Sequence, residues 1–437
     1  MVRLPRRCLP EGRVMNQYNT AKQPNRRHYT VLRQLCECIP THLVAKLARE
    51  TGVVLKARTF SCWSHVVAML YAQISHSWSL NDVCDAMRMH VTALFGIRAA
   101  KPPARNTLSH ANKVRDSALA ERLFWAMLEH LQSNFSGFCR GRDGRKKLIW
   151  RFRHAINVVD STTIQLLATC LSWAKHRRRK AAAKCHMRID LQSRLPRFAI
   201  VDTAKQHDSS RAQELCAGLA EGEIVIFDKA YVDYVHLWAL AQRGVFFVTR
   251  AKDNMACTPV RKLPKSSDPR LRCDELVELK VAASIKDYPG RLRRVTALVE
   301  VDGQLREMVF LTNNPEWAAS SVCDLYQSRW SIETFFKELK QTMQLVDFVG
   351  QSANAVRWQV WTALLVHLLL RFQAWQGRWA HSFTRLITYI RAALWLERDL
   401  FSLLKGCGTA NGHFWWLGRP EQAWLPGFAR IPVGQHA

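Results

Sequence analysis

Three acidic residues of the sequence are candidates for metal-dependent catalysis. Asp160 and Asp228 each follow a run typical of a buried strand, Ile156–Val159 and Ile224–Phe227, and Glu333 lies in a helical stretch further on. A carboxylate at the end of a buried strand is held rigidly and partly out of water, which suits a ligand for a hard cation. Taken singly, each aspartate fits the capping of a turn or helix better. Together they match the carboxylates that hold magnesium in phosphodiester chemistry.

The helix around Glu333 carries a stripe of functional side chains. Counted from Tyr326, the residues Arg329, Glu333, Lys337 and Lys340 follow after 3, 7, 11 and 14 positions. On an ideal helix these five side chains fall within an arc of about 80°. The alternative is a solvated face, since Glu333 and Lys337 are spaced for an intrahelical ion pair. Spacing alone leaves both interpretations open.

The same residues resemble a known family. The pattern Tyr326-x2-Arg329-x3-Glu333-x6-Lys340 is similar to the Y-(2)-R-(3)-E-(6)-K signature of DDE insertion-sequence transposases of the IS-four family. Asp160-Ser-Thr-Thr resembles the segment of the family's first aspartate, and Asp228-Lys-Ala-Tyr resembles that of its second. The likeness covers residues 150 to 350. The helical segment 28–131 resembles the region that many members place before the core.

The resemblance implies an α/β fold, with an RNase H-like mixed-sheet core, a β-rich insertion, an all-helical N-terminal domain and C-terminal helices. It implies that Asp160, Asp228 and Glu333 are catalytic and bind two divalent ions, Mg²⁺ or its substitute Mn²⁺. The residues that would hold DNA phosphates near these ions are Tyr326, Arg329 and Lys340, with Lys337 as a helper. Arg329 can grip phosphate oxygens bidentately, whereas the lysines act as point charges.

Partners and reaction steps follow from the same likeness. We expect double-stranded DNA, both as terminal inverted repeats and as target, and a homodimer on paired ends. A freed 3′-hydroxyl would replace water as nucleophile, with a hairpin intermediate between cutting and joining. Relatives that form hairpins can stack a flipped base on a Trp of the insertion, but no Trp lies between Trp238 and Trp317. Phe310 or another group would have to substitute, and we interpret Trp330 as core packing.

Charge and composition agree with a DNA-binding enzyme. The 437 residues include 64 Lys and Arg against 35 Asp and Glu, a formal net charge of +29, and such an excess favours a polyanionic partner. Hydrophobic residues make up 48% of the chain, too many for a disordered basic tail. The 13 Cys form no Cys-x-x-Cys pair, which favours reduced thiols in a cytoplasmic, nucleoid-associated bacterial protein. Val356–Phe372 contains Arg and His residues and is expected to be a core helix, so no membrane partner is expected.

Two basic segments are further candidates for DNA contact. The run Arg177, Arg178, Arg179 and Lys180 could be a solvated loop, but near a nuclease site it is expected to follow the DNA backbone. Arg105–Lys113 could be a recognition helix, since Asn and Arg suit adenine and guanine edges. A plain surface helix explains this second segment equally well.

Periodicity predicts how the elements are distributed. We expect four regions: a basic extension 1–27, for which Met15 is an alternative start; a helical, DNA-end-binding domain 28–135; a core 150–350 with an insertion at about 250–315; and a helical region 351–437. Strands are expected at 156–159, 185–191, 197–202, 224–227, 245–249, 276–284, 294–301 and 306–312. Helices are expected at 43–50, 66–75, 79–90, 106–131, 212–219, 232–242, 318–345, 353–374 and 382–404.

Two functions are compatible with these features. The first is a DNA transposase that cuts its own element ends and joins them to target DNA. The second is a DNA-binding protein without catalysis, a decayed transposase or repressor that occupies element ends. Every acidic and basic residue of the signature is present, which favours the first.

The excess of Lys and Arg gives a prediction that is independent of catalysis. The affinity for duplex DNA should fall steeply as salt concentration rises, because each phosphate contact releases condensed counterions. Fluorescence anisotropy over a series of salt concentrations measures this slope, and a flat response would contradict the expected basic footprint.

Overall fold

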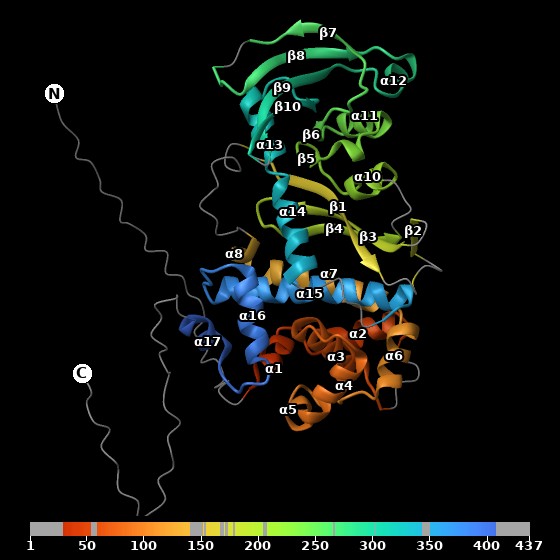
Figure 1. The fold of residues 1–437 in the computed structure, drawn as a ribbon, viewed down its shortest axis with the longest axis vertical. Coiled ribbons are helices and arrows are strands. Elements are labelled where there is room, and N and C mark those ends of the chain that lie inside the picture. The colour runs from red at the N-terminus through yellow and green to blue at the C-terminus, as the bar shows by residue number, and fades with distance from the viewer. Residues whose placement is uncertain are drawn as a thin grey trace, which may run out of the picture.

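The computed structural model describes residues 29–53, 59–139, 152, 154–166, 170, 174–177, 180–203, 208–264, 267–301, 303–342 and 350–407 (Figure 1). The predicted extension 1–27 lies outside these residues. In Figure 1 the molecule is elongated, with a helical body at the bottom, a sheet above it and a strand-rich extension at the top. The predicted mixed α/β fold class is confirmed.

Five strands form the part of the sheet that positions the aspartates. Their order is β4-β3-β1-β5-β6, in which β1 pairs antiparallel with β3 and parallel with β5. This is the mixed arrangement that an RNase H-like core requires. All of β5 is buried, as expected for a parallel strand covered on both faces. The bounds are β1 Ile156–Leu166, β3 Lys180–Asp190, β4 Pro196–Thr203, β5 Ile224–Phe227 and β6 Phe246–Arg250.

The insertion continues the same sheet. Its last strand pairs antiparallel with β6, so the order runs on as β6-β10-β9-β8-β7. The bounds are β7 Cys257–Lys262, β8 Leu271–Leu279, β9 Leu292–Val301 and β10 Gln304–Thr312. β7 was not predicted from the sequence, because it is a largely exposed edge strand that contains Pro259. The expected strand 276–284 was wrong at its end, because β8 stops at Leu279 and α12 begins at Ala282.

Each face of the core sheet has its own layer of helices. Alternate residues point to opposite faces of a strand. Val158 and Ile226 accordingly join the core that includes α13 (Ala319–Gln327) and α14 (Trp330–Lys337). The intervening Val159 and Phe227 join the core under α10 (Asp208–Cys216) and α11 (Tyr234–Gln242). The short strand β2 (Lys175–Arg177) pairs with β3 at the sheet edge.

The helix expected over 318–345 is interrupted. After α13 the chain turns at Ser328 and Arg329 before α14 begins, and a π-helical turn, η5 (Glu338–Thr342), follows α14. The Ser328 hydroxyl donates to the Leu325 carbonyl over 2.5 Å, and the Arg329 N–H bonds to the Tyr326 carbonyl at 3.0 Å, a tighter turn than an α-helix makes. The predicted stripe is therefore carried by three short helical segments. The expected helices 106–131 and 382–404 are likewise divided in two.

Helices from both ends of the chain pack into one body (Figure 1). The 24-residue helix α15 (Ala353–Gln376) is its central element, and Trp358 within it donates its indole N–H to the Arg115 carbonyl at 2.8 Å. Gln34, near the other end of the chain, donates to the Arg398 carbonyl at 2.7 Å. The other helices are α1 Val31–Glu37, α2 Leu43–Glu50, α3 Cys62–Ser75, α4 Leu80–Met89, α5 Val91–Phe95, α6 Arg105–Val114, α7 Ala118–Asn134, α8 Ser136–Cys139, α16 Phe383–Ala393 and α17 Leu400–Gly406.

The apolar run in α15 belongs to this body, as expected. In the part of the chain that the structure describes, no helix combines the length and apolarity needed to cross a membrane. The domain boundaries 28–135, 150–350 and 351–437 stay predictions. The contacts of α15 do show that residues before and after the core share one packed interior.

Trp358 gives a test of that shared interior. Trp358→Ala should lower the free energy of unfolding by about 3–5 kcal/mol, because a buried indole and its hydrogen bond are lost. Urea unfolding followed by circular dichroism measures the change. The control is Trp78→Ala, whose side chain is 78% exposed and should change stability by no more than about 0.5 kcal/mol. Equal effects of the two substitutions would contradict a central role for α15.

Candidate active site

The two aspartates lie side by side because their strands are in register. Val159 of β1 pairs with Phe227 of the parallel strand β5, so Asp160 and Asp228 occupy the next positions on adjacent strands. β5 ends there, and Asp228 becomes the N-cap of the short 3₁₀ helix η4 (Lys229–Tyr231). Successive side chains of a strand point to opposite faces, so both aspartates point to the same face as Val158 and Ile226. This is the face that α13 and α14 cover. The predicted pairing of the two carboxylates thus results from two short apolar strands.

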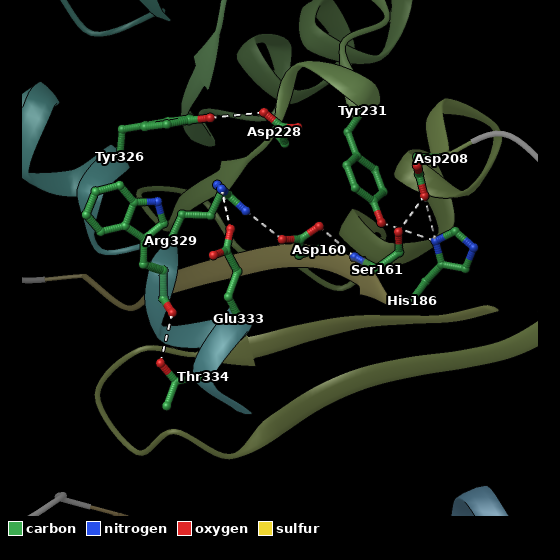
Figure 2. A network of polar contacts seen from close by, with 11 residues as sticks. Asp160, Ser161, His186, Asp208, Asp228, Tyr231, Tyr326, Arg329, Glu333 and Thr334 are labelled. Carbon is green, nitrogen blue, oxygen red and sulfur yellow. Dashed lines mark hydrogen bonds and ion pairs between the residues drawn. The ribbon is translucent and has the colours of Figure 1, made fainter. Parts of the chain in front are cut away.

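Tyr326 of α13 orients the second aspartate. Its hydroxyl donates to Asp228 Oδ1 at 3.0 Å (Figure 2), and its ring packs on Phe310 with centroids 4.8 Å apart. Burial raises the pKa of Tyr326, and the nearby Asp228 carboxylate raises it further. The phenol is therefore a stable hydrogen-bond donor at neutral pH.

Arg329 joins the first aspartate to the glutamate. Its Nη1 donates to Asp160 Oδ2 and its Nη2 to Glu333 Oε1, both at 2.6 Å (Figure 2). The guanidinium is only 12% exposed, whereas the Glu333 side chain is 51% exposed. Burial lowers the pKa of Arg329, but Asp160, Tyr326 and Glu333 outweigh it and raise the pKa above its ordinary value. Arg329 is therefore a permanent cation between two carboxylates.

Burial and several neighbouring charged groups shift the pKa of Asp160. Burial is the largest effect and raises the pKa of Asp160 to about 6, while Arg329 and the Ser161 N–H act in the opposite direction. The carboxylates of Asp228 and Glu333 raise it further. Like charges this close need a cation to share the site, and in this structure the guanidinium is that cation.

The donor set fits a divalent metal ion. Three carboxylates from β1, the end of β5 and α14 supply hard oxygen ligands of the kind that Mg²⁺ and Mn²⁺ prefer. As the side chains stand, no three His, Cys, Asp or Glu among the described residues are placed to hold a metal. Asp160 Oδ2 and Glu333 Oε1 are instead both paired with the guanidinium of Arg329.

An open cavity of about 860 Å³ lies between the insertion and α13–α14. One wall carries Asp228, Tyr326, Arg329 and Glu333, and the others carry apolar residues of β9 and β10 together with Arg250 and Arg270. Acidic residues at one end and arginines along the wall would suit a phosphodiester chain beside the carboxylates. The two arginines were not predicted from the sequence, although Arg250 ends the apolar run of β6.

Two aromatic predictions are settled by this cavity. Trp330 is half-buried and lines the cavity, so its interpretation as core packing was wrong. It begins α14 directly after the turn at Arg329, where an interrupted helix leaves its ring at the surface. Phe310, the proposed substitute for the missing Trp, is only 1% exposed under Tyr326, so its ring face is not available to a base.

The remaining predicted residues lie on α14, on η5, on the strands β2 and β3, or outside the described residues. Lys337 is exposed at the end of α14, and Lys340 is half-buried in η5. Arg178 and Arg179 lie outside the described residues. Arg177 ends β2 and Lys180 begins β3, paired with each other.

A second polar cluster adjoins the site and was not predicted. Ser161, His186, Asp208 and Tyr231 meet behind Asp160 (Figure 2). Lys184 joins them through its ion pair with Asp208. None of these five residues was among the predicted site residues. The partners of His186, Asp208 and Tyr231, are far away in the chain, so no local pattern could have revealed them.

Comparison with known proteins decides the family. A family model described as a transposase DDE domain matches residues 151–369, which is half of the chain. The chain belongs to the DDE transposases, of the IS-four type. A domain of unknown function matches residues 27–97, within the helical body. The family predicted from the signature residues is confirmed, and DNA transposition is the function of that family.

Three relatives agree with this assignment. The chain is 30% identical over 332 residues to a putative transposase of Sinorhizobium fredii, a match that covers 74% of this chain and 88% of the relative. It is 28% identical over 235 residues to a probable transposase for the insertion sequence element IS5377 of Geobacillus stearothermophilus, covering 53% and 59%. It is 27% identical over 194 residues to the transposase InsG for the insertion sequence element IS4 of Escherichia coli, covering 42% of each.

Proposed function

We propose that this transposase cuts DNA at the ends of its insertion sequence and joins those ends to target DNA, using divalent metal held by Asp160, Asp228 and Glu333. The observation that carries the proposal is that Arg329 bridges Asp160 and Glu333 while Tyr326 holds Asp228, with Asp228, Arg329 and Glu333 lining an open cavity that has further arginines in its wall. Capping alone would not require Asp160 and Glu333 to share a cation.

Divalent metal would supply the activation of water and the positive charge that the reaction needs. Bound there, two Mg²⁺ ions, or Mn²⁺ in their place, supply an activated water and neutralise the charge on the leaving oxygen. Asp160, Asp228 and Glu333 would each give carboxylate oxygens, with Asp228 kept in orientation by the Tyr326 hydroxyl. Because the three residues sit on different elements, they leave open positions for water and phosphate.

The cations of the signature would hold the substrate. Arg329, once released from Asp160 and Glu333, would present its two Nη groups to phosphate oxygens as a bidentate donor. Lys337 and Lys340 extend the positive charge along α14 and η5. DNA would therefore follow these helices toward the cavity, and the basic run 177–180 is proposed as a further backbone contact.

The joining step would use the same residues. A 3′-hydroxyl freed by cutting can take the place of water and attack the other strand or the target. If a hairpin forms, Trp330 is proposed to stack on the displaced base, because it is the tryptophan of the cavity wall. Two chains on paired ends are proposed for the active assembly.

The helical body is proposed to bind the element ends. Helix α6 presents Arg105, Asn106, His110 and Lys113 to solvent, while Leu108 and Ala111 face inward. A helix with this outer face is able to read base edges in a major groove.

Cleavage of a labelled duplex that carries one element end with its flank tests the proposed function. With Mg²⁺ the wild-type protein should nick at the element boundary, and EDTA should abolish nicking. Glu333→Gln should lower the rate by about a thousandfold or more while DNA binding persists, because a metal ligand is lost.

The matched control is Glu316→Gln, which removes the same charge from an exposed position away from the cavity and should cut at the wild-type rate. Specific binding without cutting under any divalent ion would instead support the alternative of a non-catalytic, decayed transposase or repressor.

A further inference from the structure

The buried polar cluster behind Asp160 has the layout of a positioning device. His186 and Tyr231 are fully buried, and Asp208 and Lys184 are only 17% and 15% exposed. Asp208 Oδ1 accepts from the Ser161 hydroxyl and pairs with Lys184 Nζ, both at 2.8 Å. Four polar side chains gathered around Ser161 in a buried site must satisfy one another, since an unpaired buried polar group is costly.

The cluster is attached to the first aspartate through β1. Asp160 pairs with Met187 of β3, and the next pair along is Ser161 with His186. Successive side chains point to opposite faces of a strand, so Asp160 faces α14 while Ser161 and His186 face α10 and η4. Hydrogen bonds that hold the Ser161 side chain on one face of the sheet therefore also fix the backbone of β1, which determines the direction of the Asp160 side chain on the other face.

The cluster is attached to the second aspartate through η4. Tyr231 ends the 3₁₀ turn that Asp228 caps, and its N–H donates to the Asp228 carbonyl at 3.0 Å. The Tyr231 hydroxyl lies 3.1 Å from His186 Nδ1. The same Nδ1 is 3.4 Å from Asp208 Oδ1 (Figure 2). His186 thus links the turn after Asp228 to Asp208, and Asp208 in turn holds Ser161 on the strand that carries Asp160.

A general role in stability does not explain this placement. The two backbone segments that the cluster ties together are those that carry the proposed metal ligands, and they belong to different strands. Among the described side chains, His186 Nε2 has no partner, so the imidazole is held through Nδ1 alone. Contacts behind the ligands of a metal usually fix their orientation, and losing one typically costs about 10–100-fold in metal affinity or activity.

We propose that the cluster of Ser161, Lys184, His186, Asp208 and Tyr231 sets the separation of Asp160 and Asp228, and so determines how tightly the site binds divalent metal. The inference rests on the proposed function, since it assigns these residues to the same metal site. His186 and Tyr231 are positioning residues that touch neither DNA nor metal.

Two pairs of variants test the proposal. Tyr231→Phe removes only the hydroxyl, and Tyr288→Phe is its control, a tyrosine equally buried in the same apolar core but away from the aspartates. His186→Leu removes the hydrogen-bonding atom, whereas His186→Asn keeps an amide near the position of Nδ1. The readouts are Mn²⁺ binding to the DNA-bound protein by electron paramagnetic resonance, the Mg²⁺ concentration for half-maximal cleavage, DNA affinity and thermal midpoint.

Tyr231→Phe and His186→Leu should weaken Mn²⁺ binding and raise the required Mg²⁺ about 10–100-fold, with DNA affinity unchanged. His186→Asn should restore most of the loss, and Tyr288→Phe should match the wild type. The inference is overturned if folded Tyr231→Phe binds Mn²⁺ like the wild type, or if Asn at position 186 is no better than Leu. A wild-type protein that binds no Mn²⁺ and never cuts overturns the proposed function itself, and this inference with it.

Discussion

The structure is organised around three carboxylates that repel one another and need a shared cation. Asp160, Asp228 and Glu333 are close enough for each of the last two to raise the pKa of Asp160, and Arg329 offsets part of that repulsion by bridging Asp160 and Glu333. Repulsion between like charges at short range in a partly buried site costs several kcal/mol at an effective dielectric constant of about 20. No such cluster persists unless the fold imposes it. The guanidinium of Arg329 and the proposed divalent metal would each neutralise part of this negative charge.

Several elements of the fold hold the three carboxylates in place. The register of β1 and β5 brings the aspartates together, the turn at Ser328 and Arg329 directs α14 across them, and the buried cluster around His186 braces both from the opposite face. The insertion extends the sheet through β10 and forms the far wall of the cavity. The helical body packs through α15 and η5 against the end of α14, where Glu338 pairs with Arg371 at 2.7 Å. The helical body therefore contacts the C-terminal end of the helix that carries Glu333.

Much of this could be predicted from the sequence, because the decisive features are local. Two short apolar runs, each followed by an aspartate, predict buried strands, and the spacing of Tyr326, Arg329 and Glu333 predicts that their side chains lie together, as they do in the wall of the cavity. The break after Gln327 was not predictable, since a single seryl hydroxyl bond and tertiary packing override a favourable helical pattern. Trp330 was misassigned for the same reason. The partners of His186 come from β1, α10 and η4, and contacts between such distant segments leave no pattern in the chain.

The most direct test of the central claim is to map the metal site without relying on turnover. Fe²⁺ substituted for Mg²⁺, with ascorbate and peroxide, generates radicals that cut the polypeptide next to the bound ion. The account predicts backbone cuts near residues 160, 228 and 333 together, which excess Mg²⁺ suppresses and Asp160→Asn abolishes. Cuts at one of these positions alone, or at none of them in a protein that still binds DNA, would contradict the convergence of the three carboxylates on one metal site.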